Sequence, residues 1–539
     1  MLKGDYSILY IKLGGQFLPI GLLTSNSFSE DVDMIDSMSM NSASWMTSAP
    51  TNQGYNISFD GLVKNTNFNG GDFSKISLDR LRVLKRSGTL IEWKTKEEDL
   101  SFVESGFGHI TSLSRSSTSD EFITFSANIQ GFGQIKVGNA LVIVLRTDNL
   151  GTSNDNQFTI STNPSLTYNY TVKTSDGQFF SGLTGDSTIT FNTTGVQEIS
   201  ITGVFPSFYY NNVSDKAKIT ELKEFGFYSN STTQLNAFYG CSNMVITATD
   251  LGDFSNVIYF TSAWRACSSL TSFPLIDTSS GTDFQLAWRD CSSLTSFPLI
   301  DTSSGTDFNQ AWTGCSSLTS FPLLNTSGII GFNQAWNGCS SLTSFPLLNT
   351  SSVTNFNATW NGCSSLTSFP LLNTSSVTNF NATWQNCSSL TSFPLLNISS
   401  VTNFNATWRF CSGLTSFPLL NTIGIKGFIQ SWRGCSSLIS FPLLNTSSGT
   451  NFQLAWRDCS SLVNFPANFF NSCLATNFID AFQSTNLSQT SIDNILVSIN
   501  SNGTSNGTFN QSGGSNTPSA TGVSAKNSLI SRGWTVTTN

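Results

Sequence analysis

Residues able to do nucleophilic, acid–base or metal chemistry are few in this chain. It has one histidine, His109, among 539 residues, and eleven cysteines. Nine of these cysteines, from Cys267 to Cys459, recur every 24 residues, and no C-x-x-C pair is present. Metal and redox sites need ligands clustered at short spacing. The sequence therefore predicts no metal site, and the cysteines are interpreted as small buried hydrophobic residues.

The number of acidic residues does not exclude a hydrolase that uses a pair of carboxylates, because such a site depends on the distance between the two carboxylates in the fold. Four aspartates, Asp277, Asp283, Asp301 and Asp307, lie in the early repeats, and the later repeats mostly have asparagine at those positions. A hydrolase of this kind would need two carboxylates at each active site. We therefore expect no enzymatic activity, no catalytic residue and no cofactor.

The cysteines are positioned by 24-residue repeats that run from about residue 240 to about 475. Within one unit, Phe380, Trp384 and Cys387 are spaced i, i+4, i+7, which predicts one face of a short helix or helical turn. Residues 366–371 follow the L-x-x-L-x-L pattern of a short strand, although Pro370 lacks the N–H that a central strand needs. The predicted repeat core comprises Trp288, Cys291, Leu294, Phe297, Trp360, Cys363, Leu366, Phe369, Phe380, Trp384 and Cys387.

Stacking is required because one unit buries too little apolar surface to offset the entropy of ordering its backbone. Threonine, serine and asparagine recur between the apolar positions, which predicts ladders of hydroxyls and amides on the surface of the stack. Such ladders either solvate a long surface or bind polysaccharide. Two coils break the pattern, at residues 328–331 and 423–427, and these are where we expect any specific ligand site.

The repeat resembles the BspA-like leucine-rich repeats of bacterial and phage surface proteins. The resemblance lies in the run Cys363-Ser-Ser-Leu-Thr-Ser-Phe-Pro-Leu and in the Phe-x-x-(Ala/Thr)-Trp-x-x-Cys that follows. The family usually has Met-x-x-Met-Phe at the helical turn, where this chain has Phe and Trp. It implies an α/β leucine-rich-repeat solenoid at 226–475 with display or adhesion as its role. The tail at 476–539, with helical spacing at 492–499 and near 524–531, resembles the family's C-terminal cap.

Upstream of the repeats, residues 166–205 alternate in period two around Asp176-Gly177, which predicts a hairpin turn in a small β-sandwich at 141–225. This region resembles a PKD-like, immunoglobulin-type domain. That family often carries Trp-Gly-Asp-Gly at the turn, and this chain has Thr174-Ser-Asp-Gly.

Residues 1–140 form a separate domain with denser charge and β-type segments near 6–12, 55–62, 90–95 and 121–129. Residues 78–84 are the candidate for one helix. A long polar loop is expected at 37–53. In order, these features resemble the major tail tube proteins of long-tailed bacteriophages. The segments that carry the resemblance are 27–33, Trp45, 57–61, 91–93, 106–112, 120–126 and 131–133.

The resemblance implies a β-barrel or β-sandwich that forms hexameric rings, stacked into a tube through which genomic DNA passes without specific binding. It also implies other tail proteins as partners, such as the tape measure. The loop at 37–53 would then reach a neighbouring ring. Net charge is −8, and an acidic wall keeps DNA from adhering.

The leading hypothesis is thus a mainly β, multidomain virion protein, assembled in the host cytoplasm, whose solenoid contacts a host-surface glycan or protein. The alternative is a bacterial cell-surface leucine-rich-repeat adhesin. Neither a signal peptide nor a membrane anchor is predicted from the N-terminal residues, and this favours the virion protein.

Overall fold

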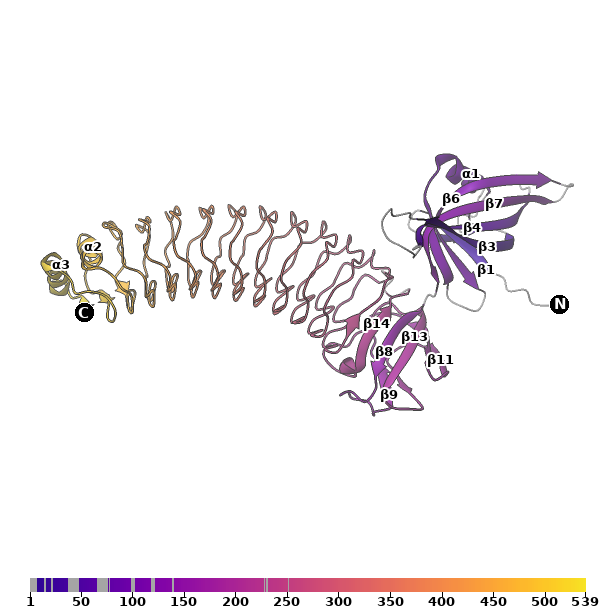
Figure 1. Ribbon diagram of the computed structural model, residues 1–539, viewed down its shortest axis with the longest axis horizontal. Coiled ribbons are helices and arrows are strands. Elements are labelled where there is room, and N and C mark those ends of the chain that lie inside the picture. The colour runs from indigo at the N-terminus through magenta and orange to yellow at the C-terminus, as the bar shows by residue number, and fades with distance from the viewer. Residues whose placement is uncertain are drawn as a thin grey trace, which may run out of the picture. The chain divides into compact units, whose positions relative to one another are not determined.

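In the computed structural model the chain forms two compact units, Met1–Leu141 and Val142–Asn539 (Figure 1). The structure describes residues 7–13, 16–20, 23–36, 48–64, 76, 78–97, 102–117, 122–137, 140–226, 228, 231–250 and 252–539. Each unit is described separately below.

The first unit is built on one seven-stranded sheet in the order β2-β1-β5-β6-β7-β4-β3. Every pairing between neighbouring strands in it is antiparallel. Its strands are β1 (Ser7–Leu13), β2 (Gln16–Pro19), β3 (Leu23–Asp36), β4 (Ser48–Lys64), β5 (Ile91–Glu97), β6 (Phe102–Ser117) and β7 (Phe122–Val137).

A single helix, α1 (Leu78–Ser87), supplies the apolar cover of this sheet. Leu81 on the helix and Trp93 on β5 are fully buried, and Ile57 and Ile129 from paired strands join the same cluster. Alternate residues of a strand point to one face, so the buried residues of the sheet meet the helix as one core. The helix predicted at residues 78–84 is confirmed and is one turn longer than expected.

The predicted barrel is not closed among the described strands of this unit. The described strands form one open sheet, with β2 at one edge and β3 at the other. Because α1 already covers the core, no second sheet is needed to bury it. The predicted loop is also shorter than expected, since residues 48–53 belong to β4, and Ser48 pairs with Asp36. Residues 37–47 lie outside the described part of the chain.

The second unit begins with a six-stranded sheet, β11-β10-β13-β8-β14-β15, beside a two-stranded sheet of β12 and β9. The predicted hairpin turn at Asp176-Gly177 joins β10 to β11, and Gly177 has the positive φ of +85° that such a turn requires. The strands are β8 (Leu141–Arg146), β9 (Gln157–Ile160), β10 (Asn169–Thr174), β11 (Phe179–Leu183), β12 (Ser187–Thr190), β13 (Val196–Val204), β14 (Ile219–Glu224) and β15 (Val245–Ile246).

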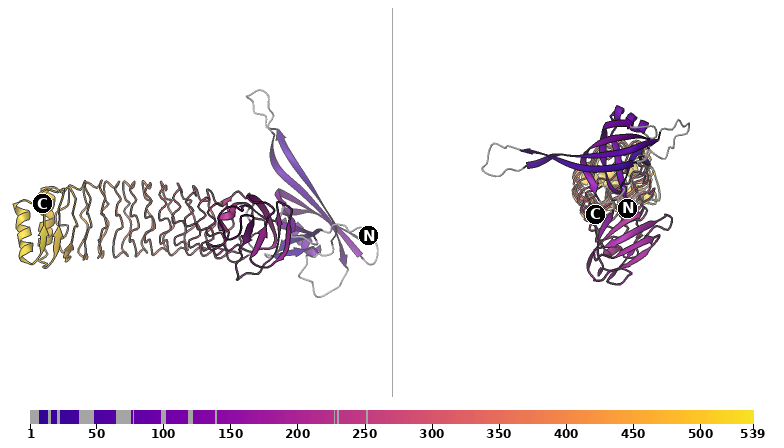
Figure 2. Two further views of the ribbon diagram at one scale, coloured as in Figure 1. Left: turned by 90° about the horizontal axis from the view of Figure 1, so that it is seen from below. Right: turned by 90° about the vertical axis from the view of Figure 1, so that its right-hand side faces the viewer.

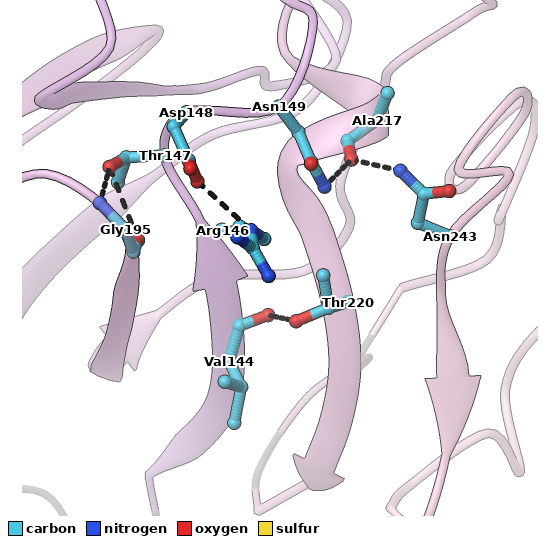
Figure 3. A network of polar contacts seen from close by, with 9 residues as sticks. All are labelled: Val144, Arg146, Thr147, Asp148, Asn149, Gly195, Ala217, Thr220 and Asn243. Carbon is cyan, nitrogen blue, oxygen red and sulfur yellow. Dashed lines mark hydrogen bonds and ion pairs between the residues drawn. The ribbon is translucent and has the colours of Figure 1, made fainter.

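The six-stranded sheet continues directly into the repeats. A 3-10 turn (Lys216–Lys218) leads into β14, which pairs antiparallel with β8 and parallel with β15 in the first coil. The Ala217 carbonyl accepts hydrogen bonds from the side-chain amides of Asn149, at 3.0 Å, and Asn243, at 2.7 Å (Figure 3). Sheet and repeats therefore share backbone pairing and polar contacts.

The repeats form a coil stack, which we define as residues 231–484, with its coils side by side (Figure 2). Where the sequence predicted a helical turn, each coil has a series of tight turns instead. Thr383 N donates to Phe380 O within its coil, whereas Trp384 N donates to Thr407 O of the next coil. Positive φ values at Ala382 and Asn386, of 53° and 62°, are incompatible with a helix.

The short strand predicted at residues 366–371 is also absent from the described coils. Pro370 has no N–H, and its carbonyl accepts from Leu372 N at 2.9 Å in a tight turn. The isolated parallel bridges that link most coils lie instead just before the buried phenylalanine, as at Asn355 and Asn379. The α/β description of the repeats is therefore wrong, because the coils contain turns and single bridges.

The C-terminal residues close the open end of the stack. Two helices, α2 (Gln489–Asn500) and α3 (Ala520–Ser531), lie at that end with a three-stranded parallel sheet (Figure 1). Side-chain caps begin both helices, since Ser488 accepts from Ser491 N and Ser519 accepts from Thr521 N. The sheet comprises β16 (Asn477–Phe478), β17 (Thr508–Asn510) and β18 (Thr535–Thr537).

Candidate interaction surfaces

The predicted repeat-core residues all lie inside the coil stack, each at most 8% exposed. Trp360 is typical: its ring lies 5.8 Å from the rings of both Trp336 and Trp384, parallel to each, and 4.8 Å from Phe369, edge to face. Cys363 Sγ donates to the Trp336 carbonyl at 3.3 Å. These side chains build columns of stacked rings and thiols, so they position a surface and do not form a site themselves.

The cysteine thiols have low reactivity in this arrangement. All eleven are free and buried. Burial raises the pKa of the thiols along the column, to about 12 for Cys339, Cys411 and Cys459. Since the thiolate is the nucleophile and metal ligand, these side chains are protonated in the folded protein at neutral pH.

Clusters of metal-ligating side chains are not found among the residues that the structure describes. His109 lies on β6, in register with Gln130 of β7. No helix in the described ranges is long and apolar enough to cross a membrane.

The four aspartates of the early coils shape turns. The Asp283 carboxylate accepts from Gln285 N at 2.8 Å, and that of Asp307 accepts from Asn309 N at 2.7 Å. Asn355 does the same in a later coil, accepting from the backbone two residues on at 2.8 Å. Burial raises the pKa of Asp307, and the neighbouring charge of Asp283 adds to this. A neutral amide replaces the carboxylate without loss of the turn, so the aspartates have a structural role.

The predicted ladders of hydroxyls and amides are confirmed. Thr343 Oγ1 donates to the Thr319 carbonyl at 3.2 Å, and Thr367 repeats the contact one coil later at 3.4 Å. Asn357 Nδ2 donates to Asn333 Oδ1 at 2.8 Å. These hydroxyl and amide donors are therefore used between coils and serve the stack.

A column of exposed leucines runs along the coil stack, and sequence reasoning missed it. In each Phe-Pro-Leu-Leu segment the second apolar residue after proline is buried, at 2–4% exposed, while the first is 52–64% exposed. The L-x-x-L-x-L pattern places Leu371 with the core positions, whereas Leu372 is the buried residue and Leu371 is exposed. We define the leucine column as Leu275, Leu299, Leu323, Leu347, Leu371, Leu395, Leu419 and Leu443.

The two irregular coils expose isoleucines rather than a polar site. Ile330 and Ile423 are 58% and 62% exposed, whereas Ile329 and Ile425 in the same segments are fully buried. The irregular segments therefore keep one core residue each and differ from the other coils only at the surface.

The strand edges of the first unit are the other candidate surface. β3 is 14 residues long and pairs through β4 on one side only, in the part of the chain that is described. An edge strand presents a row of backbone N–H and C=O groups that another strand can pair with. The sheet thus carries a long edge suited to backbone pairing with another chain.

The solved structures that match part of this chain include two from gene transfer agent particles. The tail of an empty gene transfer agent particle, determined with C6 symmetry, is 19% identical, with a TM-score of 0.19, and the match covers 24% of this chain and 93% of that chain. The virion of a native gene transfer agent is 21% identical, with a TM-score of 0.18, and covers 24% and 94%. At these values neither match establishes a fold or a function here. No family model and no curated protein matches the sequence.

Proposed function

We propose that this chain is a structural subunit of a bacteriophage tail tube that displays a leucine-rich-repeat module on the virion. The first unit assembles into hexameric rings, the rings stack around a DNA conduit, and the coil stack is a non-catalytic decoration that contacts the host surface. Other tail proteins, including the tape measure, are its partners in this assembly.

The observation that carries the proposal is the open antiparallel sheet of the first unit. A sheet closed into a barrel has no edges, whereas this one has β3, 14 residues long, at one end. A long unpaired edge is an aggregation hazard in a monomer, and repeated edge-to-edge pairing through a rotation that closes gives a ring. The order of sequence features that resembles tail tube proteins falls on this same sheet.

The second unit supports display rather than catalysis. Its carboxylates shape turns and its cysteines are buried as neutral thiols. We infer an immunoglobulin-like sandwich at the start of the unit and a leucine-rich-repeat solenoid of the BspA type after it. A stack whose polar donors serve the coils themselves presents a regular exterior with few charged side chains, which suits binding or spacing.

Proline substitutions along the β3 edge test the assembly. In an antiparallel edge strand, consecutive residues direct their N–H alternately toward the neighbouring strand and away from it. Of Ser27→Pro and Phe28→Pro, one therefore removes an N–H bonded to β4, and the other removes an outward N–H. We expect the outward variant to keep wild-type circular dichroism and to lose ring formation in electron micrographs.

Normal rings from both variants, with folding intact, would exclude the β3 edge as the assembly contact. If full-length protein forms only monomers and binds bacterial envelopes, the adhesin becomes the better account.

A further inference from the structure

The leucine column is an apolar surface that folding does not require. Its eight members are 52–64% exposed, and the adjacent buried residue in each coil already fills the core. Half-buried surface positions elsewhere in the repeat vary in residue type, as at Arg289, Asn361 and Gln385, which each follow the buried tryptophan. All eight column positions are leucine and recur every 24 residues on neighbouring coils, so they form a continuous apolar stripe along the coil stack.

We propose that the leucine column is a self-association surface, on which the coil stack of a second copy of this chain docks, column against column. The contact is isologous, so each copy contributes the same leucines. The pairing does not depend on the tube, because it joins second units only.

Periodicity favours a second copy over other partners. The tryptophan rings of adjacent coils are separated by 5.2–5.9 Å throughout the column. Only a partner with the same spacing between coils keeps every leucine in contact along eight coils, since a partner with a different spacing would lose alignment with the leucines. A second coil stack has the same structure and therefore the same spacing.

Charge also favours self-pairing. In the six coils from Thr319 on, the surface segment Thr-Ser-Phe-Pro-Leu-Leu-Asn contains no charged residue, and its one variation is Ile439 in place of threonine. Ile439 is 53% exposed and widens the apolar stripe. Like charges directly opposed cost several kcal/mol at an interface. In these six coils two copies of this face meet without that penalty, whereas Asp277 and Asp301 lie two residues after the first two leucines of the column.

The leucine column alone supplies the area of a small interface. Full burial of a leucine side chain corresponds to about 60–120 Å² of apolar surface. Eight leucines at about 60% exposure thus offer on the order of 300–600 Å² per copy, already at the size of the largest patch on a typical monomer. With both copies counted, the leucines contribute about 600–1,200 Å², which reaches the lower limit of stable interfaces, and the flanking proline and threonine columns add to it.

Cysteine cross-linking on the full-length chain tests the pairing directly. All native cysteines are buried, so an equimolar mixture of the single variants Leu347→Cys and Leu371→Cys carries the only reactive thiols, and with one per copy no cross-link can form within a copy. These two positions lie at the middle of the column. Each therefore lies opposite position 347 or 371 of the second copy, whether the stacks run parallel or antiparallel. The matched control is an equimolar mixture of the single variants Leu150→Cys and Val213→Cys, at positions 89% and 62% exposed outside the coil stack.

A short bis-maleimide should cross-link the column variants to a dimer and leave the control monomeric on a denaturing gel. In sedimentation velocity, Leu347→Glu with Leu371→Glu should weaken self-association by at least about tenfold, because each pair would bury unpaired charge. The control Leu150→Glu with Val213→Glu should not.

Cross-linking no better than the control would overturn the proposal, and so would unchanged association of the glutamate variant. Loss of binding to bacterial envelopes by the glutamate variant, without any cross-linking at the column, would assign the surface to a host partner instead.

Discussion

Replacing Trp360 with alanine should open the centre of the coil stack. Its ring is fully buried and contacts the rings of two tryptophans and three phenylalanines, at centroid distances of 4.8–5.8 Å. Substituting alanine for a buried tryptophan costs about 3–5 kcal/mol. One term offsets this, because the buried indole N–H of Trp360 has no hydrogen-bond partner. Removing such a group returns about 1–3 kcal/mol, so we expect a net loss of about 2 kcal/mol.

Thiol labelling during urea unfolding measures this loss in the stack alone. Every cysteine lies between residues 241 and 473 and is buried, whereas the first unit has none. Labelling therefore reports opening of the coils and is silent about the first unit. The midpoint shift multiplied by the urea slope gives the change in unfolding free energy.

Trp360→Phe is the matched control for this substitution. It keeps an aromatic ring in the column and deletes the unpaired N–H, so it should cost about 1 kcal/mol. A loss below about 1 kcal/mol for Trp360→Ala, or equal losses for both variants, would refute the stacked column as a source of stability.

Three further predictions follow from the same structure. The pKa of the buried thiols is raised above the ordinary value of 9.0, so their contribution to the free energy of unfolding is complete below pH 9 and is lost as the pH rises toward 12. Urea unfolding at a series of pH values should show the free energy of unfolding fall by up to about 1.4 kcal/mol per pH unit for each thiol. A urea midpoint that stays constant between pH 8 and 11 would contradict this. Burial acts to raise the pKa of Asp215, but hydrogen bonds from Ser153 and Thr159 outweigh it and lower the pKa below 3.8. Asp215→Asn should therefore cost about 2–3 kcal/mol at pH 7 by calorimetry, and the wild type should lose this contribution only below about pH 4; a variant with the wild-type melting temperature would disprove the role. Finally, Leu371→Ser should change stability by less than about 0.5 kcal/mol, whereas Leu372→Ser, at 2% exposure, should cost more than about 2 kcal/mol; equal urea midpoints for the two would show that the exposed and buried leucines are wrongly assigned.

The core of the repeats was predictable because its spacing is a property of one coil. Trp384 and Cys387 recur at a constant spacing from coil to coil, so each occupies an equivalent core position in the stack. The short helix or helical turn predicted from that spacing did not form because the decisive hydrogen bonds run to residues 23 positions away, as from Trp384 N to Thr407 O. Local periodicity contains no information about such partners.

The leucine column could not be predicted for a related reason. In Leu371-Leu372 the two side chains are chemically identical, and only the turn after Pro370 decides which one faces the core. In the first unit, α1 and the strands β1, β4, β5 and β7 were predicted from the sequence, whereas β2, β3 and β6 were not. The open edge at β3 was not, because pairing partners along a sheet are non-local.

Cryo-electron microscopy of the full-length protein at raised concentration tests the central claim most directly. The account predicts hollow tubes of stacked rings, with the open sheets of the first unit in the tube wall and the coil stacks outside it. Isolated monomers at every concentration, with no ring or tube, would contradict it.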